Sequence, residues 1–250
     1  MRLAGARVLV TGASSGIGAA TAVELGRRGA RVLLAGRDTE ALGEVAAQID
    51  HAVWHAEDLA TPDGVPRLAA WAESAGGIDV LVCNAGIGWA GKLVEMPDHC
   101  VSELVTVNVT ATMRLTRALI SPIIHNGHGQ LVFVSSIAGC IGVADEAVYS
   151  GTKGALKLFA DALRVELADT GIGVTSVFPG VVKTAFFQRR GQDYDRERPR
   201  PIPASTVAIA IARAIERRQA EVFTPSWMRF PARLHGAFPA MVQNLQRRFG

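Results

Sequence analysis

Short, continuously apolar runs alternate along the chain with longer segments in which apolar residues recur every three or four positions. The short runs are rich in valine, leucine and isoleucine, which is typical of strands buried on both faces of a sheet. They lie at Arg7–Val10, Arg31–Ala35, Ala52–His55, Ile78–Val82, Gln130–Ser135, Gly173–Phe178 and Glu221–Thr224. The pattern therefore predicts a sheet of about seven strands.

The segments between these runs predict helices. Helical spacing of apolar residues is clearest at Gly18–Arg28, Val101–Ile120, Val148–Ala168 and Ser205–Arg218. Strands that alternate with helices are joined by crossover connections and therefore run parallel. No internal repeat or low-complexity linker divides the chain. We expect the α/β class, with one doubly wound Rossmann-type parallel sheet and helices on both of its faces.

Two segments do not fit the alternation. Residues 186–203 are polar and arginine-rich, contain three prolines, and predict a mobile surface loop. Residues 226–250 carry apolar side chains at roughly helical spacing among arginines, and we expect Pro231 and Pro239 to break this segment into pieces. The chain is thus divided into one domain over residues 1–225 and an amphipathic extension over 226–250 that is not an independent domain.

Composition excludes several classes of protein. Of 250 residues, 49% are hydrophobic, which is too many for a disordered chain. The net charge of +3 is small, and no basic patch interleaved with aromatic residues indicates a nucleic-acid partner. The beginning of the chain does not resemble a signal peptide, and no apolar run is long enough to span a membrane. The cysteines and histidines lack metal-ligand or disulfide spacing. We expect a soluble, cytoplasmic protein without a metal site.

A glycine-rich turn follows the first predicted strand and opens the first predicted helix. It contains Gly12, Ser14, Ser15, Gly16, Ile17 and Gly18. Glycines allow unusual dihedral angles and a close approach of the backbone to a ligand, and a helix N-terminus favours a pyrophosphate. Glycine clusters also form ordinary turns, and the spacing here is GxxxGxG instead of GxGxxG. The order of strand, turn and helix favours a dinucleotide site.

The end of the second predicted strand indicates which dinucleotide is bound. NAD-selective proteins usually place an acid there, which binds the ribose 2′-hydroxyl. Here Gly36 stands at that place and Arg37 follows, whose guanidinium can hold a 2′-phosphate. Asp38 could be the acid in a shifted register, but it is better interpreted as the cap of the next helix. Arg37 could also be a solvated surface residue. The sequence favours NADP(H) over NAD(H).

A candidate acid–base pair lies further along the chain. Tyr149 and Lys153 are four residues apart and share one face of a predicted helix. A tyrosine pKa is normally about 10, and a neighbouring ammonium group lowers it toward neutral pH. Ser136 follows a predicted strand at its carboxyl end, where ligands bind in open α/β sheets.

With these motifs the chain resembles the classical short-chain dehydrogenase/reductase family. The resemblance covers residues 6 to about 224 and includes motifs in the family's order. They are the turn Thr11–Gly18, Asp58-Leu59, Asn84-Ala85-Gly86, Asn108, Ser135-Ser136, Tyr149 with Lys153, and Pro179-Gly180 with Thr184.

The resemblance implies four catalytic residues. Tyr149 would act as the general acid in carbonyl reduction and as the base in alcohol oxidation. Lys153 would lower the Tyr149 pKa and hold the nicotinamide ribose. Ser136 would stabilise the substrate oxygen, whereas Ser135 is expected to be structural. Asn108 would hold a water molecule that links Lys153 to solvent, or it is an ordinary amide inside a helix.

The resemblance also implies the cofactor contacts. Asp58 would accept a hydrogen bond from the adenine amine, with Leu59 beside the ring. The turn Asn84-Ala85-Gly86 would pack near the adenine ribose. Pro179, Gly180 and Val182 would shape the nicotinamide pocket, and Thr184 would bind the carboxamide or a phosphate.

The sequence indicates less about the substrate than about the fold or the cofactor. A substrate loop at about 185–203 is expected to cover the site. Phe186 and Phe187 either line an apolar pocket opposite residues 142–144 or anchor the loop. We expect a hydrophobic carbonyl or alcohol substrate. The alternatives are an NAD-preferring alcohol dehydrogenase of the same family, an epimerase or dehydratase on the same fold, and a non-catalytic NADP(H)-binding regulator.

The resemblance further implies a homodimer or homotetramer that assembles through the helices carrying Asn108 and Tyr149. For the extension 226–250, packing over the pocket or against another subunit is favoured over contact with a membrane surface.

Overall fold

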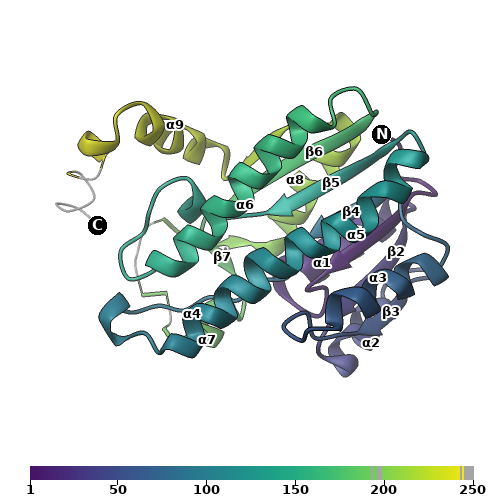
Figure 1. Ribbon diagram of the computed structural model, residues 1–250, viewed down its shortest axis with the longest axis horizontal. Coiled ribbons are helices and arrows are strands. Elements are labelled where there is room, and N and C mark those ends of the chain that lie inside the picture. The colour runs from purple at the N-terminus through teal and green to yellow at the C-terminus, as the bar shows by residue number, and fades with distance from the viewer. Residues whose placement is uncertain (193, 196–198, 243, 245–250) are drawn as a thin grey trace.

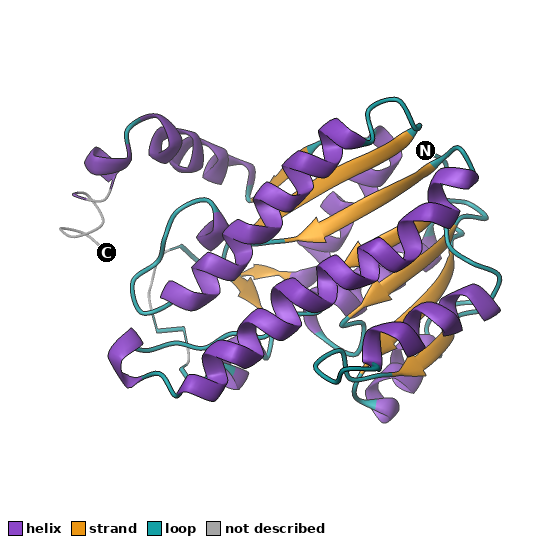
Figure 2. Ribbon diagram, in the orientation of Figure 1, coloured by secondary structure: helices purple, strands orange, loops and turns teal. Residues whose placement is uncertain are grey.

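The computed structural model of the chain describes residues 1–192, 194–195, 199–242 and 244. Parts of the predicted loop 185–203 and the end of the extension 226–250 lie outside the described residues. The remaining elements form a layered α/β structure, with the sheet between two sets of helices (Figures 1 and 2).

The seven predicted strands are all present, with bounds that differ by no more than two residues. They are β1 (Arg7–Thr11), β2 (Arg31–Gly36), β3 (Val53–Ala56), β4 (Val80–Cys83), β5 (Gly129–Val134), β6 (Ile172–Pro179) and β9 (Glu221–Thr224). All neighbouring pairs are parallel, in the order β3-β2-β1-β4-β5-β6-β9. The order reverses between β1 and β4, and this switch point is where ligands bind in open α/β sheets.

The helices cover both faces of the sheet. They are α1 (Gly16–Arg27), α2 (Thr39–Ala46), α3 (Gly64–Ser74), α4 (Asp98–Val105), α5 (Thr112–His125), α6 (Ala147–Glu166) and α8 (Ala204–Arg217). Strand β1 illustrates the two-sided core, because Val8 packs in the cluster that contains α1, α2 and α8, and Leu9 packs in the cluster that contains α3, α5 and α6. The predicted doubly wound, single-domain fold is confirmed.

A π-helical turn joins α4 and α5. The sequence predicted one regular helix over Val101–Ile120, and the axis is indeed continuous in Figure 1. Residues Thr106–Ala111, labelled η2, are however π-helical. Such turns are rare and frequently occur at functional sites. Asn108 lies within this turn.

The segment after β6 is more structured than the sequence predicted. Strands β7 (Val182–Lys183) and β8 (Ile202–Pro203) pair with each other, and the short helix α7 (Phe186–Arg189) lies between them. The prediction of a mobile loop is therefore wrong for the two ends of this segment, which form regular elements. The aromatic side chains of α7 explain the order, because they pack into the site described below.

The extension begins with the turn η4 (Ser226–Met228) and the helix α9 (Arg229–Ala237). Pro231 does not break this helix, which corrects the sequence interpretation. It occupies the first helical turn, where a proline is tolerated because the N–H groups there have no partner within the helix. Pro239 follows just after the helix ends.

The short turns η1 (Leu93–Glu95) and η3 (Ile137–Gly139) complete the described elements.

Candidate active site

A large cavity opens at the carboxyl ends of the parallel strands. Its volume is about 1570 Å³, which exceeds the usual range of roughly 300–1,000 Å³ for small-molecule sites. The glycine-rich turn, the ends of β2 and β5, helix α7 and the start of the extension all contribute to its walls. The cavity therefore has room for a dinucleotide together with a second small molecule.

The glycine-rich turn folds tightly against the residue that follows β4. The Asn84 side chain donates a hydrogen bond of 2.9 Å to the carbonyl of Thr11, across the turn. Gly12 has a φ of +64°, and a Cβ on Gly18 would collide with the Gly12 carbonyl. A side chain at position 12 or 18 would push the turn off Asn84, so both glycines are required by packing.

The first turn of α1 is the anion-binding end of the cavity. Ser15 is the N-cap residue, but its side chain makes no capping hydrogen bond within the helix. Its hydroxyl instead accepts a hydrogen bond of 3.1 Å from the Arg189 guanidinium. Helix N–H groups, the helix dipole and a guanidinium thus converge at one point, an arrangement suited to a phosphate group. Sequence reasoning missed Arg189.

The three residues at the end of β2 and just after it, Gly36, Arg37 and Asp38, have different roles. Asp38 is the N-cap of α2, and its carboxylate accepts a hydrogen bond of 3.0 Å from the Ala41 amide. The predicted helix-capping role of Asp38 is confirmed. Arg37 is exposed and lines the cavity, and Gly36 lies against Ser14.

The predicted adenine and nicotinamide residues also lie in the cavity wall. The structure places there Asp58, Leu59, Asn84, Ala85, Gly86, Pro179, Gly180, Val182 and Thr184, together with Ser14, Gly16 and Ile17 of the turn. Gly18 does not line the cavity, because it packs under the turn. Thr184 lies against Gly16, so the segment after β7 closes on the glycine-rich turn.

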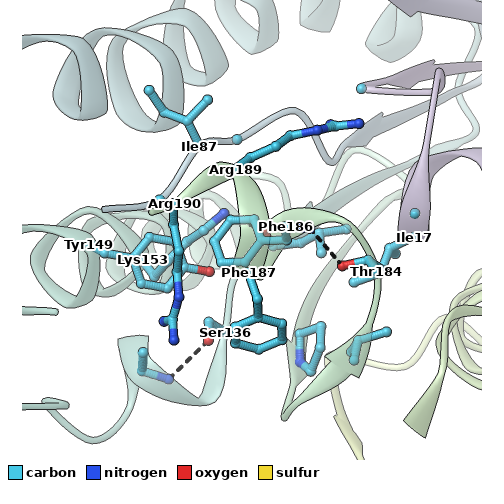
Figure 3. A pocket seen from close by; sticks show the side chains of 18 of the residues that line it. Ile17, Ile87, Ser136, Tyr149, Lys153, Thr184, Phe186, Phe187, Arg189 and Arg190 are labelled. Carbon is cyan, nitrogen blue, oxygen red and sulfur yellow. Dashed lines mark hydrogen bonds between the residues drawn. The ribbon is translucent and has the colours of Figure 1, made fainter. Parts of the chain in front are cut away.

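Tyr149, Lys153 and Ser136 converge at the other end of the cavity (Figure 3). The Lys153 ammonium lies 5.8 Å from the centre of the Tyr149 ring and donates a hydrogen bond of 3.0 Å to the carbonyl of Val134 at the end of β5. Ser136 follows β5 directly, and its hydroxyl accepts a bond of 3.1 Å from the Ala138 amide.

Burial controls the protonation of this group. Burial raises the pKa of the Tyr149 phenol, and a hydrogen bond with Ser136 acts against this increase. Nearby Glu146 raises the Tyr149 pKa further, and Arg190 lowers it. Burial also lowers the pKa of Lys153 to about 8. We expected Lys153 to lower the Tyr149 pKa, but in this structure burial dominates and the opposing groups are Ser136 and Arg190.

Asn108 is fully buried and its side chain is used by the protein. Its amide oxygen accepts from the Ile87 N–H at 2.8 Å, and its amide nitrogen donates to the Ile87 carbonyl and to the Thr152 hydroxyl, both at 3.0 Å. The side chain therefore fixes the segment after β4 against α6. The backbone carbonyl of Asn108 in the π-helical turn is a further acceptor that could hold the expected water molecule.

The two adjacent serines make different contacts. The Ser135 hydroxyl donates a hydrogen bond of 2.8 Å to the carbonyl of Lys153, so it ties β5 to α6. Both serines lie in the cavity wall with Tyr149, and Ser136 is the one that hydrogen-bonds with Tyr149.

Helix α7 forms the remaining wall. The Phe186 ring lies 5.5 Å from the Tyr149 ring, between centroids. Phe187 also lines the cavity, so these residues both line the pocket and hold the segment in place. Val143 and Ala144 lie in the wall, as expected, whereas Gly142 is not among the lining residues.

Arg190 enters the same end of the cavity. Its side chain, 9% exposed, forms an ion pair with Glu146 and lies 4.6 Å from the centre of the Phe187 ring. Arg189 and Arg190 leave the chain in different directions, with Arg190 beside Tyr149 and Ser136 (Figure 3). The arginine pair that follows Phe186-Phe187 after one intervening residue was the available sequence signal for both arginines.

Within the described residues, no group of histidine, cysteine or acidic side chains is arranged to hold a metal ion. No helix in that part of the chain is long and apolar enough to cross a membrane.

The fold and the site define a nucleotide-binding α/β protein, and comparisons with known proteins identify the class. The family model described as short chain dehydrogenase matches residues 6–195. An uncharacterized oxidoreductase of Myxococcus xanthus is 39% identical over 181 residues, which cover 70% of this chain and 72% of the relative. The chain therefore belongs to the short-chain dehydrogenase/reductase family.

Solved structures agree with this assignment. A short-chain dehydrogenase from Sphingobium yanoikuyae, in complex with NADPH, is similar with a TM-score of 0.84 and 28% identity over 95% of each chain. A family member from Burkholderia phymatum, in complex with NAD, has a TM-score of 0.86 and 22% identity over 95% of each chain, which shows the shared fold. The chain is an oxidoreductase of this family, and a nicotinamide cofactor is supported.

Proposed function

We propose that the chain is an NADP(H)-dependent oxidoreductase that interconverts a carbonyl and an alcohol, with Tyr149 as the acid–base. The observation that carries this proposal is the convergence of Ser136, Tyr149 and Lys153 at one end of a cavity whose other end holds the glycine-rich turn and Arg37. Geometry of this kind places a reacting carbon and its oxygen between the cofactor site and a proton donor.

The protein residues have defined tasks in this proposal. When bound, the nicotinamide supplies or accepts the hydride. In the reductive direction, the Tyr149 hydroxyl transfers its proton to the substrate oxygen as the C–H bond forms at the carbonyl carbon. Ser136 donates a hydrogen bond to the same oxygen and stabilises the developing charge. In the oxidative direction, both transfers reverse.

Lys153 would support the proton transfer and the cofactor. Its buried ammonium lies over the Tyr149 ring and would favour the phenolate once Tyr149 has given up its proton. It is also placed to hold ribose hydroxyls. The Asn108 backbone carbonyl would bind a water molecule that returns the proton from solvent.

Two arginines at the end of the cavity with the glycine-rich turn support the proposed cofactor preference. Arg37 would hold the 2′-phosphate, because Gly36 offers no carboxylate and the Asp38 carboxylate caps α2. Arg189 would contact the pyrophosphate, since it already bonds to Ser15 at the N-terminus of α1. An NAD-preferring enzyme is the second candidate, favoured by the similar structure that is in complex with NAD.

The substrate side favours an apolar molecule. Phe186, Phe187, Val143 and Ile141 line the cavity near Tyr149. Besides Lys153, Arg190 brings a cation to this end, and its pairing with Glu146 neutralises it. Hydrophobic ketones, aldehydes or alcohols fit this wall better than polyhydroxylated sugars. A non-catalytic regulator is disfavoured, because Ser136, Tyr149 and Lys153 are all present in the cavity.

The proposal is tested by following NADPH consumption with a panel of hydrophobic carbonyls and small sugars. We expect turnover of the hydrophobic compounds and a loss of about 10²–10⁴-fold in kcat for Tyr149→Phe. The variant should still bind NADPH, which shows that it is folded. Turnover of sugars alone contradicts the apolar substrate, and an unchanged kcat in Tyr149→Phe contradicts the assigned acid–base.

A further inference from the structure

The turn η4 and the helix α9 present a row of apolar side chains to solvent. Trp227 lies in η4, Phe230 and Leu234 lie about one turn apart on α9, Phe238 directly follows the end of the helix, and Met241 lies three residues further on. Their exposed fractions are 52% for Trp227, 77% for Phe230, 40% for Leu234, 59% for Phe238 and 45% for Met241. We call these five residues the α9 face.

The fold itself does not use the α9 face. None of the residues of α9 is buried, and the helix stands away from the sheet and its covering helices in Figure 1. The segment is fixed near its base, and Val242, beyond the end of α9, is buried as well. Met228 packs against Gly180, and Arg233 forms an ion pair of 2.6 Å with Glu221. An exposed row of aromatic and aliphatic side chains on a fixed helix indicates a binding surface.

The charge around this face limits what can cover it. Residues 226–250 contain four arginines and no aspartate or glutamate. Arg229 and Arg233 lie on α9 beside the apolar side chains. A helix that carries exposed Phe and Leu side chains and no acidic side chain beside its arginines is typical of helices that lie in the interface of an anionic membrane.

A second copy of this chain fits the same face less well. If two copies paired through α9, the cationic sides of both helices would approach each other without an acidic partner from this segment. Like charges brought together at an interface oppose association. An anionic lipid surface instead complements Arg229, which lies beside the apolar side chains, whereas Arg233 is already paired with Glu221.

The α9 face adjoins the cavity, so docking on a membrane would also place the cavity at the membrane. Trp227, Met228 and Pro231 contribute to the cavity wall, although Trp227 also belongs to the α9 face. We propose that the α9 face docks on the surface of an anionic lipid bilayer and holds this wall of the cavity at the lipid. The cavity would then open where hydrophobic molecules are concentrated. The docking does not depend on the proposed function.

The experiment is vesicle flotation of the full chain, read by protein in the lipid fraction, without cofactor or substrate. Vesicles of phosphatidylcholine and phosphatidylglycerol at 3:1 are compared with pure phosphatidylcholine. We expect binding to the anionic vesicles that weakens in 0.5 M NaCl. The double variant Phe230→Ser/Phe238→Ser should lose at least about tenfold in affinity. Arg229→Gln should lose about fivefold at low salt, which corresponds to about 1 kcal/mol.

The control is Val53→Ser, which removes an exposed apolar residue on β3, far along the chain from α9. It should bind the vesicles as the unaltered chain does. Light scattering of the double variant separates the two occupants of the face. A lower oligomer mass in the double variant with no vesicle binding by the unaltered chain would show a contact between copies and overturn the proposal. Equal binding of all variants, or no preference for anionic vesicles, would overturn it as well.

Discussion

Lys153 shows how a single buried side chain connects stability with function. It is 4% exposed and hydrogen-bonds to the Val134 carbonyl. Burial lowers its pKa to about 8, from 10.5 for a free lysine. The folded chain therefore holds the ammonium form at neutral pH at a cost in stability. The buried cation beside Tyr149 therefore lowers the stability of the folded chain while it serves the active site.

The variant Lys153→Met tests this interpretation. Between pH 8 and 10.5 the unfolded chain still binds the lysine proton and the folded chain has released it, so the wild type gains stability with rising pH. Relative to the variant, the gain should be on the order of 3 kcal/mol, because the pKa differs by 2.5. Denaturant unfolding at pH 7.5 and pH 10.5 measures it. Lys157→Met, one turn further along α6, is the control, and an equal effect in both variants would contradict the account.

Arg189 makes a second prediction at the scale of the residue. Arg189→Gln should weaken NADPH and NADH binding to the same extent, by about five- to tenfold, because a pyrophosphate is common to both cofactors. Fluorescence titration of both cofactors provides the measurement. A loss confined to NADPH would place Arg189 at the 2′-phosphate instead.

At this scale the sequence predicts what local spacing encodes. The pair Tyr149 and Lys153 is four residues apart on one helix, and Asp38 precedes a helix that it caps, so both could be recognised. Arg189 and Ser15 are far apart in the sequence, and only the folding of the segment after β7 onto the glycine-rich turn brings them together. The direction of the Tyr149 pKa shift was missed for a similar reason, since it depends on how deeply the fold buries the ring.

Among the elements, the glycine-rich turn is the one most constrained by packing. A Cβ at position 18 would meet the Gly12 carbonyl and the Asn84 amide. We expect Gly18→Ala to lower the free energy of unfolding by about 1–3 kcal/mol and to weaken NADPH binding, because the turn would move off Asn84. Thermal unfolding and cofactor titration measure the two effects.

Gly43→Ala is the matched control for this prediction. Gly43 lies in α2 with open space around the position of its Cβ. The substitution should stabilise the chain by about 0.5–1 kcal/mol, because alanine has the higher helix propensity. If Gly18→Ala behaves like Gly43→Ala, the glycine-rich turn is not closely packed as described.

Hydrophobic periodicity predicted the strands and most helices, because β1, β2, β4, β5 and β6 are buried almost throughout and the helices are amphipathic. Strand β3 is the exception, since Val53 and Trp54 are exposed. It could not predict the π-helical turn at Thr106–Ala111, where the register shifts by one residue inside a continuous apolar pattern. It also missed α7, since Phe186 is ordered by a contact with Tyr149, which lies distant in the sequence.

For the whole molecule, the exposed apolar residues of α4 and α6 support assembly of several copies. Leu158 and Val165 on α6 are 68% and 78% exposed and lie two turns apart on one side of the helix, and Val105 on α4 is 42% exposed. We propose a homodimer or homotetramer that buries this side. Apolar side chains this exposed are typical of surfaces that a partner covers.

The double variant Leu158→Glu/Val165→Glu should therefore dissociate to the monomer mass of 26.4 kDa in light scattering, because buried unpaired carboxylates would be costly. Val94→Glu, which changes an 88% exposed residue on η1, is the control and should keep the assembly. An assembly unchanged in the double variant would exclude this side as the interface.

The central claim is that the cavity binds a nicotinamide cofactor with a preference for NADP(H) set by Arg37. The most direct measurement is a fluorescence titration of the chain with NADPH and NADH, repeated with Arg37→Ala. The account predicts at least about tenfold tighter binding of NADPH, as expected for a charge-assisted bond to the 2′-phosphate, and loss of that difference in the variant with NADH binding unchanged. Tighter binding of NADH, or an NADPH preference that survives in Arg37→Ala, would contradict it.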